Sequence, residues 1–267
     1  MQDLKITLIQ TSIYWQDPEA NRSMLEEKIW KLTRQTDVIV LPEMFTTGFT
    51  MDTTHAEHPR GRTWKWLHQQ AAQSGAAITG SIIVKDGEKF RNRLYWVEPD
   101  GTEYFYDKKH LFRMAGETNY YAQGDKRLIV TYREWKIALF ICYDLRFPVW
   151  MRNRYDRDEE ALDYDAFIVV ANWPGIRIDA WRNLLKARAI ENLSFGIGVN
   201  RTGIDENEIR YNGYSALVDP RGERLRELKD EEGFLETELN EELIRDYRKK
   251  FPAFLDSDFF EFGLNNE

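Results

Sequence analysis

Short apolar runs that end abruptly recur along this chain and predict buried β-strands. Clear examples are residues 37–42 (DVIVLP), 136–141 (KIALFI) and 167–171 (FIVVA). Helical patterns lie between the early runs, and Asp17 followed by Pro18 is a favourable helix start. Strands that alternate with helices predict an α/β protein rich in sheet, with helices packed on the outside.

The remaining elements are expected from the same kinds of pattern. We expect strands at residues 4–10, 77–84, 92–97, 102–106, 128–131, 195–200 and 214–218, and helices near 18–32, 63–73, 180–192 and 241–249. The turn residues PDG at 99–101 join two of these strands into a hairpin. The first part of the chain alternates strands with helices, but hairpins follow it. This order does not fit a simple doubly wound sheet.

Composition limits the class of protein. The 267 residues are 42% apolar and include no linker or repeat, so we expect one domain. A net charge of −8 disfavours a nucleic-acid-binding protein. No apolar run is long enough to span a membrane, the N-terminus lacks the regions of a signal peptide, and the single cysteine cannot form an internal disulfide. We therefore expect a cytoplasmic protein.

The only cysteine, Cys142, directly follows the apolar run 136–141 and is soon followed by Pro148. This pattern predicts a strand that ends in a sharp bend. The sulfur would lie at the carboxyl end of the strand, where ligands gather in α/β sheets. A thiol in that position can be a nucleophile if a neighbouring group favours its thiolate. On this segment alone, a core cysteine that fills an apolar hole is an equal alternative.

Two further reactive groups follow strand patterns. Glu43 comes directly after residues 37–42, and Lys108 and Lys109 follow the strand expected at 102–106. Each of them alone is more simply explained as a turn or surface residue. Together with Cys142 they supply a covalent acyl-transfer site, with a carboxylate base and an ammonium that stabilises an oxyanion. The backbone N–H of Tyr143 is placed to be the second oxyanion donor.

The sequence offers no metal or cofactor motif. Its histidines and single cysteine do not have metal-ligand spacing, and it contains neither of the glycine-rich nucleotide-binding patterns. We therefore expect an enzyme that uses no metal and no cofactor.

Several blocks of this sequence resemble the nitrilase, or carbon–nitrogen hydrolase, superfamily. LPEMF at 41–45, DKKHLF at 107–112 and ICYDLRF at 141–147 match its three signature blocks. Other blocks occur in the family's order, namely ITLIQ at 6–10, ANWP at 171–174, KARAIEN at 186–192, VNRTG at 199–203 and GYSALVDPRG at 213–222. The resemblance covers nearly the whole chain.

This resemblance implies a four-layer α-β-β-α sandwich over residues 1–250, and a homodimer. Residues 251–267 form a tail rich in phenylalanine, with Phe251, Phe254, Phe259, Phe260 and Phe262. Exposed aromatic side chains at a chain end would favour aggregation unless they were covered. We expect the tail to pack on a partner subunit, with packing on its own domain as the alternative.

The resemblance also implies roles for site residues. It makes Glu43 the general base, Lys108 the catalytic lysine and Cys142 the nucleophile. Lys109 occupies a variable position of the family, which agrees with strand alternation, because only one of two adjacent lysines can point inward. Glu117 resembles a second glutamate that many members place beside the site to position the substrate or the lysine.

Within the superfamily, residues 107–117 and 120–124 are most similar to the bacterial ω-amidase branch. That branch hydrolyses the terminal amide of 2-oxoglutaramate or 2-oxosuccinamate to the 2-oxo dicarboxylic acid and ammonia. We expect Phe45 and Trp173 to bound a small pocket and Arg113 or Arg146 to bind the substrate carboxylate. Core packing of the aromatic residues and structural ion pairs of the arginines are the alternatives.

Other functions remain open at this point. The same residues would suit another hydrolase of the superfamily, such as an aliphatic amidase, a nitrilase or an N-carbamoyl amine hydrolase. A single-cysteine redox protein is a further alternative, although it would need neither Glu43 nor Lys108.

Overall fold

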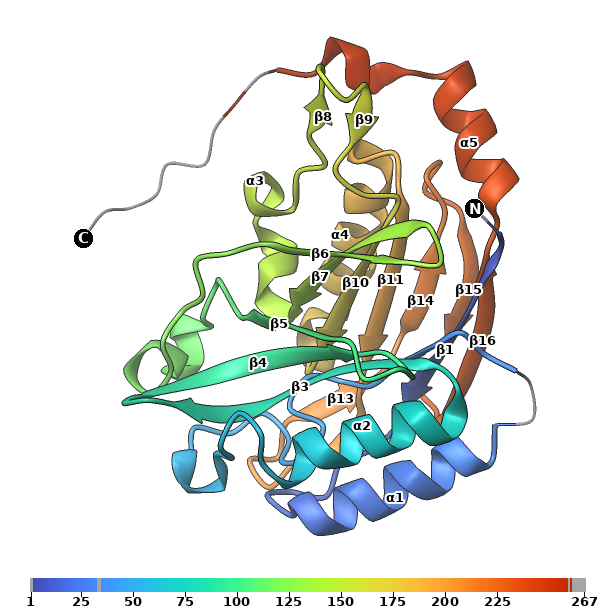
Figure 1. The fold of residues 1–267 in the computed structure, drawn as a ribbon. Coiled ribbons are helices and arrows are strands. Elements are labelled where there is room, and N and C mark those ends of the chain that lie inside the picture. The colour runs from blue at the N-terminus through green and yellow to red at the C-terminus, as the bar shows by residue number, and fades with distance from the viewer. Residues whose placement is uncertain (1, 33–34, 259, 261–267) are drawn as a thin grey trace.

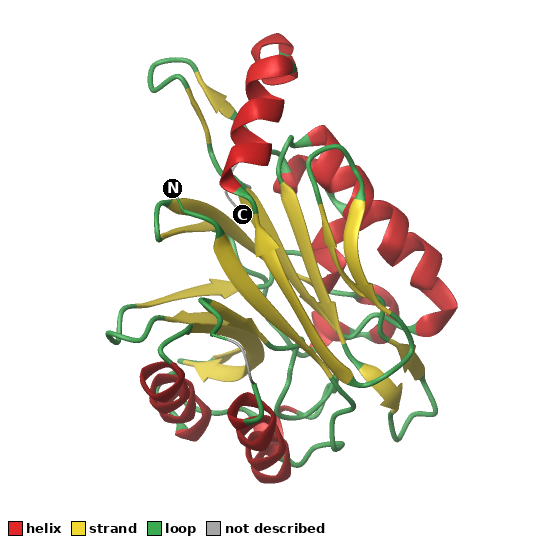
Figure 2. Cartoon of the chain, turned by 90° about the vertical axis from the view of Figure 1, so that its right-hand side faces the viewer, coloured by secondary structure: helices red, strands yellow, loops and turns green. Residues whose placement is uncertain are grey.

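Two six-stranded sheets stacked between helices form the body of the molecule, shown as a ribbon in Figure 1. The computed structural model describes residues 2–32, 35–258 and 260. Helices α1 (Pro18–Trp30) and α2 (Arg62–Ser74) cover the outer face of the first sheet, and α4 (Ile178–Glu191) covers the second. Figure 2 shows the sheets in yellow between these helices. The expected α-β-β-α sandwich is therefore confirmed.

The first sheet has the strand order β16–β1–β2–β3–β4–β5. Its strands are β16 (Gly233–Leu239), β1 (Leu4–Gln10), β2 (Val38–Val40), β3 (Ala77–Asp86), β4 (Lys89–Val97) and β5 (Glu103–Asp107). Strands β1, β2 and β3 run parallel, whereas β3, β4 and β5 form an antiparallel meander. Parallel pairing in the centre brings the carboxyl end of β2 to the same edge as that of β1.

The second sheet has the strand order β15–β14–β11–β10–β7–β6. Its strands are β15 (Arg224–Leu228), β14 (Ser215–Val218), β11 (Phe195–Asn200), β10 (Ala166–Ala171), β7 (Trp135–Ile141) and β6 (Leu128–Tyr132). The three central strands β7, β10 and β11 run parallel, so their carboxyl ends also share one edge.

Small elements complete the described chain. The short hairpins are β12 (Thr202–Ile204) with β13 (Arg210–Asn212) and β8 (Tyr155–Asp156) with β9 (Ala161–Leu162). The remaining helices are α3 (Pro148–Met151) and α5 (Glu241–Lys250). No helix in the described ranges has the length and apolar character needed to cross a bilayer.

Side-chain alternation along β1 and β2 divides the apolar residues between two clusters. In β2, Val38 and Val40 join the cluster that includes the second sheet, whereas Ile39 packs with the helices α1 and α2. In β1, Leu8 and its neighbour Ile9 divide in the same way. Both faces of these strands are therefore buried, which explains why β2 reads as a continuous apolar run.

Most of the expected elements are present, but β16 and the strands of the two short hairpins were not predicted. Asp17 caps α1 by accepting a hydrogen bond from the backbone N–H of Ala20 at 3.0 Å, as its sequence position predicts. Strand β16 has the sequence GFLETEL and pairs along its whole length with β1 at the sheet edge. Only Leu235 and Leu239 of this strand are buried, and its polar residues gave no strong strand pattern.

The C-terminal segment is described only in part. After α5, a 3₁₀ turn spans Ala253–Asp256, and the ring of Phe254 lies 4.9 Å from that of Tyr155. Phe251 is 54% exposed. Two of the expected tail aromatics, Phe259 and Phe262, lie outside the described residues.

Candidate active site

Cys142 stands where strand β7 ends and the chain bends sharply. It is the first residue of a 3₁₀ turn, Cys142–Arg146, and Pro148 then begins α3. Its backbone φ is +44°, a conformation that non-glycine residues seldom adopt and that is frequent at functional turns. The bend places the buried thiol at the end of the sheet, where it lines a cavity.

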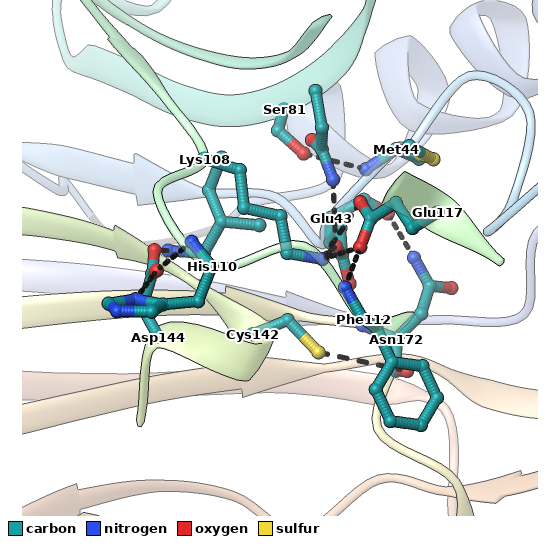
Figure 3. A network of polar contacts seen from close by, with 12 residues as sticks. Glu43, Met44, Ser81, Lys108, His110, Phe112, Glu117, Cys142, Asp144 and Asn172 are labelled. Carbon is teal, nitrogen blue, oxygen red and sulfur yellow. Dashed lines mark hydrogen bonds and ion pairs between the residues drawn. The ribbon is translucent and has the colours of Figure 1, made fainter. Parts of the chain in front are cut away.

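The carboxylate of Asp144 holds this bend in place (Figure 3). It accepts hydrogen bonds from the backbone N–H of Ile141 at 3.0 Å and from the Tyr106 hydroxyl at 2.7 Å. It also accepts from the backbone N–H of His110 at 2.9 Å and contacts Nδ1 of the same residue at 2.8 Å. Asp144 therefore ties the turn that carries Cys142 to the segment that follows β5.

Lys108 follows β5 and is almost completely buried. Its Nζ donates to Oε1 of Glu43 at 2.8 Å and to the two carboxylate oxygens of Glu117 at 3.1 and 3.0 Å. Lys109 points elsewhere, with its Nζ 5.2 Å from the centre of the Trp150 ring. Of the two adjacent lysines, Lys108 is thus the one that meets both carboxylates.

Glu43 is fully buried and is held by donors from three other segments. Besides Lys108, the Nδ2 of Asn92 donates to its Oε1 at 2.8 Å, and the backbone N–H of Asn172 donates to its Oε2 at 2.8 Å. Asn172 directly follows β10, and its carbonyl oxygen lies 4.0 Å from the Cys142 sulfur. The carboxyl ends of β2, β7 and β10 therefore meet at one place, as Figure 3 shows.

The electrostatics of this cluster leave the thiol protonated at rest. Burial and the neighbouring Glu43 carboxylate raise the pKa of Cys142 well above its ordinary value, although Lys108 opposes them. Burial alone would lower the pKa of Lys108, but Glu117 and Glu43 outweigh it and raise that pKa. The amine therefore remains an ammonium, and the thiol needs a base to become a nucleophile.

Glu117 is the second carboxylate that accepts hydrogen bonds from Lys108. It is fully buried, and it also accepts a hydrogen bond from the backbone N–H of Phe112. Burial raises its pKa, and Lys108 opposes that shift. Its contacts place it against the lysine. Positioning the lysine is one of the two roles that the family resemblance implies for it.

A cavity of about 310 Å³ opens directly above Cys142 and Lys108. Its aromatic wall consists of Phe49, Phe112, Tyr143, Trp173 and Tyr211. The ring of Tyr143 makes an edge contact with Phe112 at 5.0 Å between ring centroids. The nucleophile, the ammonium and the aromatic wall therefore border one small cavity, of a size suited to a small molecule.

Two of the residues expected to contact the substrate lie outside this cavity. Phe45 is fully buried and packs on Trp66 of α2, with 5.9 Å between ring centroids. Arg113 is exposed on the 3₁₀ turn Arg113–Ala115 and does not line the cavity. By contrast, Trp173 and Arg146 both line it, and the Arg146 guanidinium lies 4.9 Å from the Trp173 ring.

Sequence reasoning missed several residues that line the cavity. Asn172 follows the end of the strand run 167–171, so the rule that located Cys142 could have found it too. Arg177 lines the cavity from the turn after Pro174. Phe49 and Tyr211 come from loops and a short hairpin, whose packing leaves no pattern in the sequence. Across the described part of the chain, no group of three His, Cys, Asp or Glu side chains could hold a metal ion.

Comparisons with known proteins point in one direction. The family model for carbon-nitrogen hydrolase matches residues 5–249. The omega-amidase YafV of Yersinia enterocolitica is 44% identical over 264 residues, covering 97% of this chain and 99% of that protein. The 2-oxoglutaramate amidase of Bacillus subtilis is 32% identical, covering 94% of this chain and 96% of that protein.

A solved structure is also very similar. The protein XC1258 of Xanthomonas campestris superposes with a TM-score of 0.96 at 44% identity, covering 98% of this chain and all of that one. That structure is described as a CN-hydrolase superfamily protein with an arsenic adduct in its active site.

Proposed function

The chain belongs to the carbon–nitrogen hydrolase family, and on that premise we propose that it hydrolyses the terminal amide of a small 2-oxo acid amide. The substrates are 2-oxoglutaramate or 2-oxosuccinamate, and the products are the 2-oxo dicarboxylic acid and ammonia. The convergence of Glu43, Lys108 and Cys142 beneath one small cavity carries this proposal. The relatives named omega-amidase and 2-oxoglutaramate amidase support the choice of substrate.

The reaction begins with the thiol of Cys142. Glu43 takes the thiol proton as the sulfur attacks the amide carbonyl carbon, and the carbonyl oxygen becomes an oxyanion. The Lys108 ammonium and the backbone N–H of Tyr143 stabilise that oxyanion. The tetrahedral intermediate then collapses to a thioester as the carbon–nitrogen bond breaks, and Glu43 returns the proton to the departing ammonia.

Water completes the cycle. Glu43, again a carboxylate, removes a proton from a water molecule that attacks the thioester carbonyl. The second tetrahedral intermediate releases the carboxylic acid, and the Cys142 thiol regains its proton. Glu117 contributes by holding the ammonium of Lys108 at 3.0 Å, which fixes its direction toward the oxyanion.

The cavity also supports a substrate that carries a carboxylate. The Arg146 guanidinium lies on the Trp173 ring and has no ion-pair partner in the part of the chain that the structure describes. Arginine recognises carboxylates by paired hydrogen bonds, so we assign Arg146 to the carboxylate end of the substrate. Trp173 bounds the pocket beside it.

An ammonia-release assay tests this function. The purified enzyme should hydrolyse 2-oxoglutaramate and 2-oxosuccinamate with a kcat/KM at least about 100-fold above that for glutamine or a simple nitrile, because a polar site discriminates strongly against groups that it cannot pair. Comparable or faster turnover of the nitrile, or release of carbon dioxide from a carbamoyl amine, would instead favour a sister activity of the family.

We also propose that residues 1–250 act as one hydrolase domain and that the segment after α5 joins a homodimer interface. Phe251 and Leu255 are 54% and 51% exposed, and neighbouring exposed apolar side chains can mark a protein–protein interface. Light scattering should then give a mass near twice 31.8 kDa.

Two variants examine that interface. The double variant Phe251→Ser with Leu255→Ser should shift the protein toward the monomer mass. Trp30→Ser is the matched control, because Trp30 is 71% exposed on α1, far from α5 in Figure 1. Dissociation by the Trp30 variant, or a monomeric wild type, would contradict the proposed interface.

A further inference from the structure

Arg177 is fixed at the rim of the cavity by its own backbone. It ends the 3₁₀ turn Gly175–Arg177, just before α4 begins. Its N–H donates to the carbonyl oxygen of Pro174 at 2.9 Å, and its carbonyl oxygen accepts from Nε1 of Trp173 at 2.8 Å. The position of this residue is therefore set by the same tryptophan that supports Arg146.

The guanidinium of Arg177 has no anionic partner within the described residues. Its Nη2 lies 3.3 Å from the sulfur of Met114, a weak acceptor, and its Cζ lies 5.7 Å from the centre of the Phe112 ring. Several other arginines of this chain are paired with a carboxylate. Arg182, for example, pairs with Glu227 at 2.9 Å. An arginine that lines a cavity without a carboxylate partner has its hydrogen-bonding capacity available for a ligand.

The charge of the cavity is strongly one-sided. Lys108, Arg146 and Arg177 line it, and its lining contains no aspartate or glutamate. The carboxylates of Glu43 and Glu117 are fully buried and are already bound to Lys108. The two guanidinium groups therefore present uncompensated positive charge to an anionic group that enters the cavity.

The cations are also divided between the two ends of the cavity. Lys108 lies at the base with Cys142, whereas Arg177 lies at the rim beside Ile176, which is 89% exposed. A small substrate with an amide at one end and a carboxylate at the other matches this division. The amide reaches the sulfur while the carboxylate remains between the arginines.

We propose that Arg177 is a second carboxylate-binding residue, which with Arg146 determines the specificity of the enzyme for anionic amides. The inference rests on the proposed function for the identity of the substrate. Arg177 acts on substrate binding and not on the chemical step, because it does not contact the reacting atoms at the base of the cavity.

The variant Arg177→Gln tests this role by comparing a charged and a neutral substrate. It should raise the KM for 2-oxoglutaramate about 10- to 100-fold, the range expected when a charged hydrogen bond is lost. Its kcat should change little, and hydrolysis of the neutral amide pentanamide should stay within about twofold of wild type. Arg177→Lys should recover part of the affinity, because it keeps the charge but not the paired geometry.

The matched control is Arg113→Gln, since Arg113 is exposed on a neighbouring turn and does not line the cavity. Arg113→Gln should leave the hydrolysis of both substrates unchanged. The inference would be overturned if Arg177→Gln lost activity equally on 2-oxoglutaramate and on pentanamide. An unchanged KM for 2-oxoglutaramate would overturn it as well.

Binding of the product without turnover separates this inference from the proposed function. Calorimetry should show that 2-oxoglutarate binds to Cys142→Ala at least about tenfold more tightly than to the double variant that also carries Arg177→Gln. If wild type fails to hydrolyse 2-oxo amides but this difference holds, the proposed function fails and the role of Arg177 stands. If hydrolysis occurs without this difference, the role of Arg177 fails alone. Absence of both binding and hydrolysis would overturn both.

Discussion

Replacing Cys142 with alanine should abolish ammonia release from 2-oxoglutaramate and leave the fold intact. The sulfur is the only cysteine sulfur in the chain and lines the cavity above Lys108. Without it no thioester can form, and removing a nucleophile that acts as one unit with its base typically costs about 10⁴- to 10⁶-fold in kcat. The measurement is the rate of ammonia release under saturating substrate.

Stability should hardly change in this variant. The Cys142 sulfur makes a long contact of 4.0 Å to the carbonyl oxygen of Asn172, so alanine removes little bonding. Alanine also tolerates the φ of +44° about as well as cysteine does. A thermal unfolding midpoint within a few degrees of wild type therefore serves as the control.

Mass spectrometry adds a direct test of the intermediate. Acid-quenched wild type should carry the acyl group of the substrate, and Cys142→Ala should carry none. Full activity in the alanine variant would eliminate the proposed mechanism. Turnover that depends on peroxide, without an acyl adduct, would favour a redox protein instead.

The positions of the reactive groups could be predicted because they follow strand ends. Glu43 and Cys142 each follow a buried apolar run, and parallel strands carry their carboxyl ends to one edge. No single apolar run in the sequence indicates that the carboxyl edges of the two sheets meet. Only pairing and stacking of the strands, which involve residues far apart in the chain, place Glu43 next to Lys108.

The substrate-contacting residues were harder to predict because local backbone conformation decides them. Phe45 lies two residues after Glu43, and strand alternation would point both to one side. Met44 between them has a φ of +43°, which interrupts the alternation and turns Phe45 into the core beside α2. Phe45 therefore lies outside the cavity, in contrast to the expectation that it bounds the pocket.

The arginines show the same limit. Arg113 and Arg177 both stand at 3₁₀ turns, and neither turn has a pattern that reveals which side chain points inward. Arg177 lines the cavity because Trp173 holds the backbone of its turn, whereas Arg113 faces solvent. Whether an arginine at such a turn lines the cavity or faces solvent depends on contacts between segments. Local sequence composition does not indicate these contacts.

Replacing Lys108 with methionine should remove activity and weaken the fold, whereas the same change at Lys109 should do neither. Lys108 joins two buried carboxylates, and breaking a buried ion pair by removing one partner costs about 3–5 kcal/mol. Loss of an oxyanion donor should lower kcat at least about 10²- to 10³-fold. Lys109→Met loses only a contact with the Trp150 ring, worth about 1 kcal/mol or less.

The stability loss in Lys108→Met should depend on pH with a definite sign. Burial already raises the pKa of Glu117, and removing the ammonium removes the main opposing influence. A carboxyl whose pKa is higher in the folded than in the unfolded state favours folding at low pH and opposes it as pH rises. Urea unfolding should therefore show a larger loss at pH 8 than at pH 5.

A double variant separates the structural role of Lys108 from its chemical role. In Lys108→Met with Glu117→Gln, one of the two buried carboxylates that Lys108→Met leaves without the ammonium becomes a neutral amide, so most of the lost stability should return. Activity should stay absent, because no ammonium faces the oxyanion. If turnover recovers together with stability, Lys108 serves the fold alone. Only an amine within reach of Glu43 can stabilise charge that develops above Cys142. If Lys109→Met lowers activity more than Lys108→Met does, then the wrong lysine has been assigned to the chemistry.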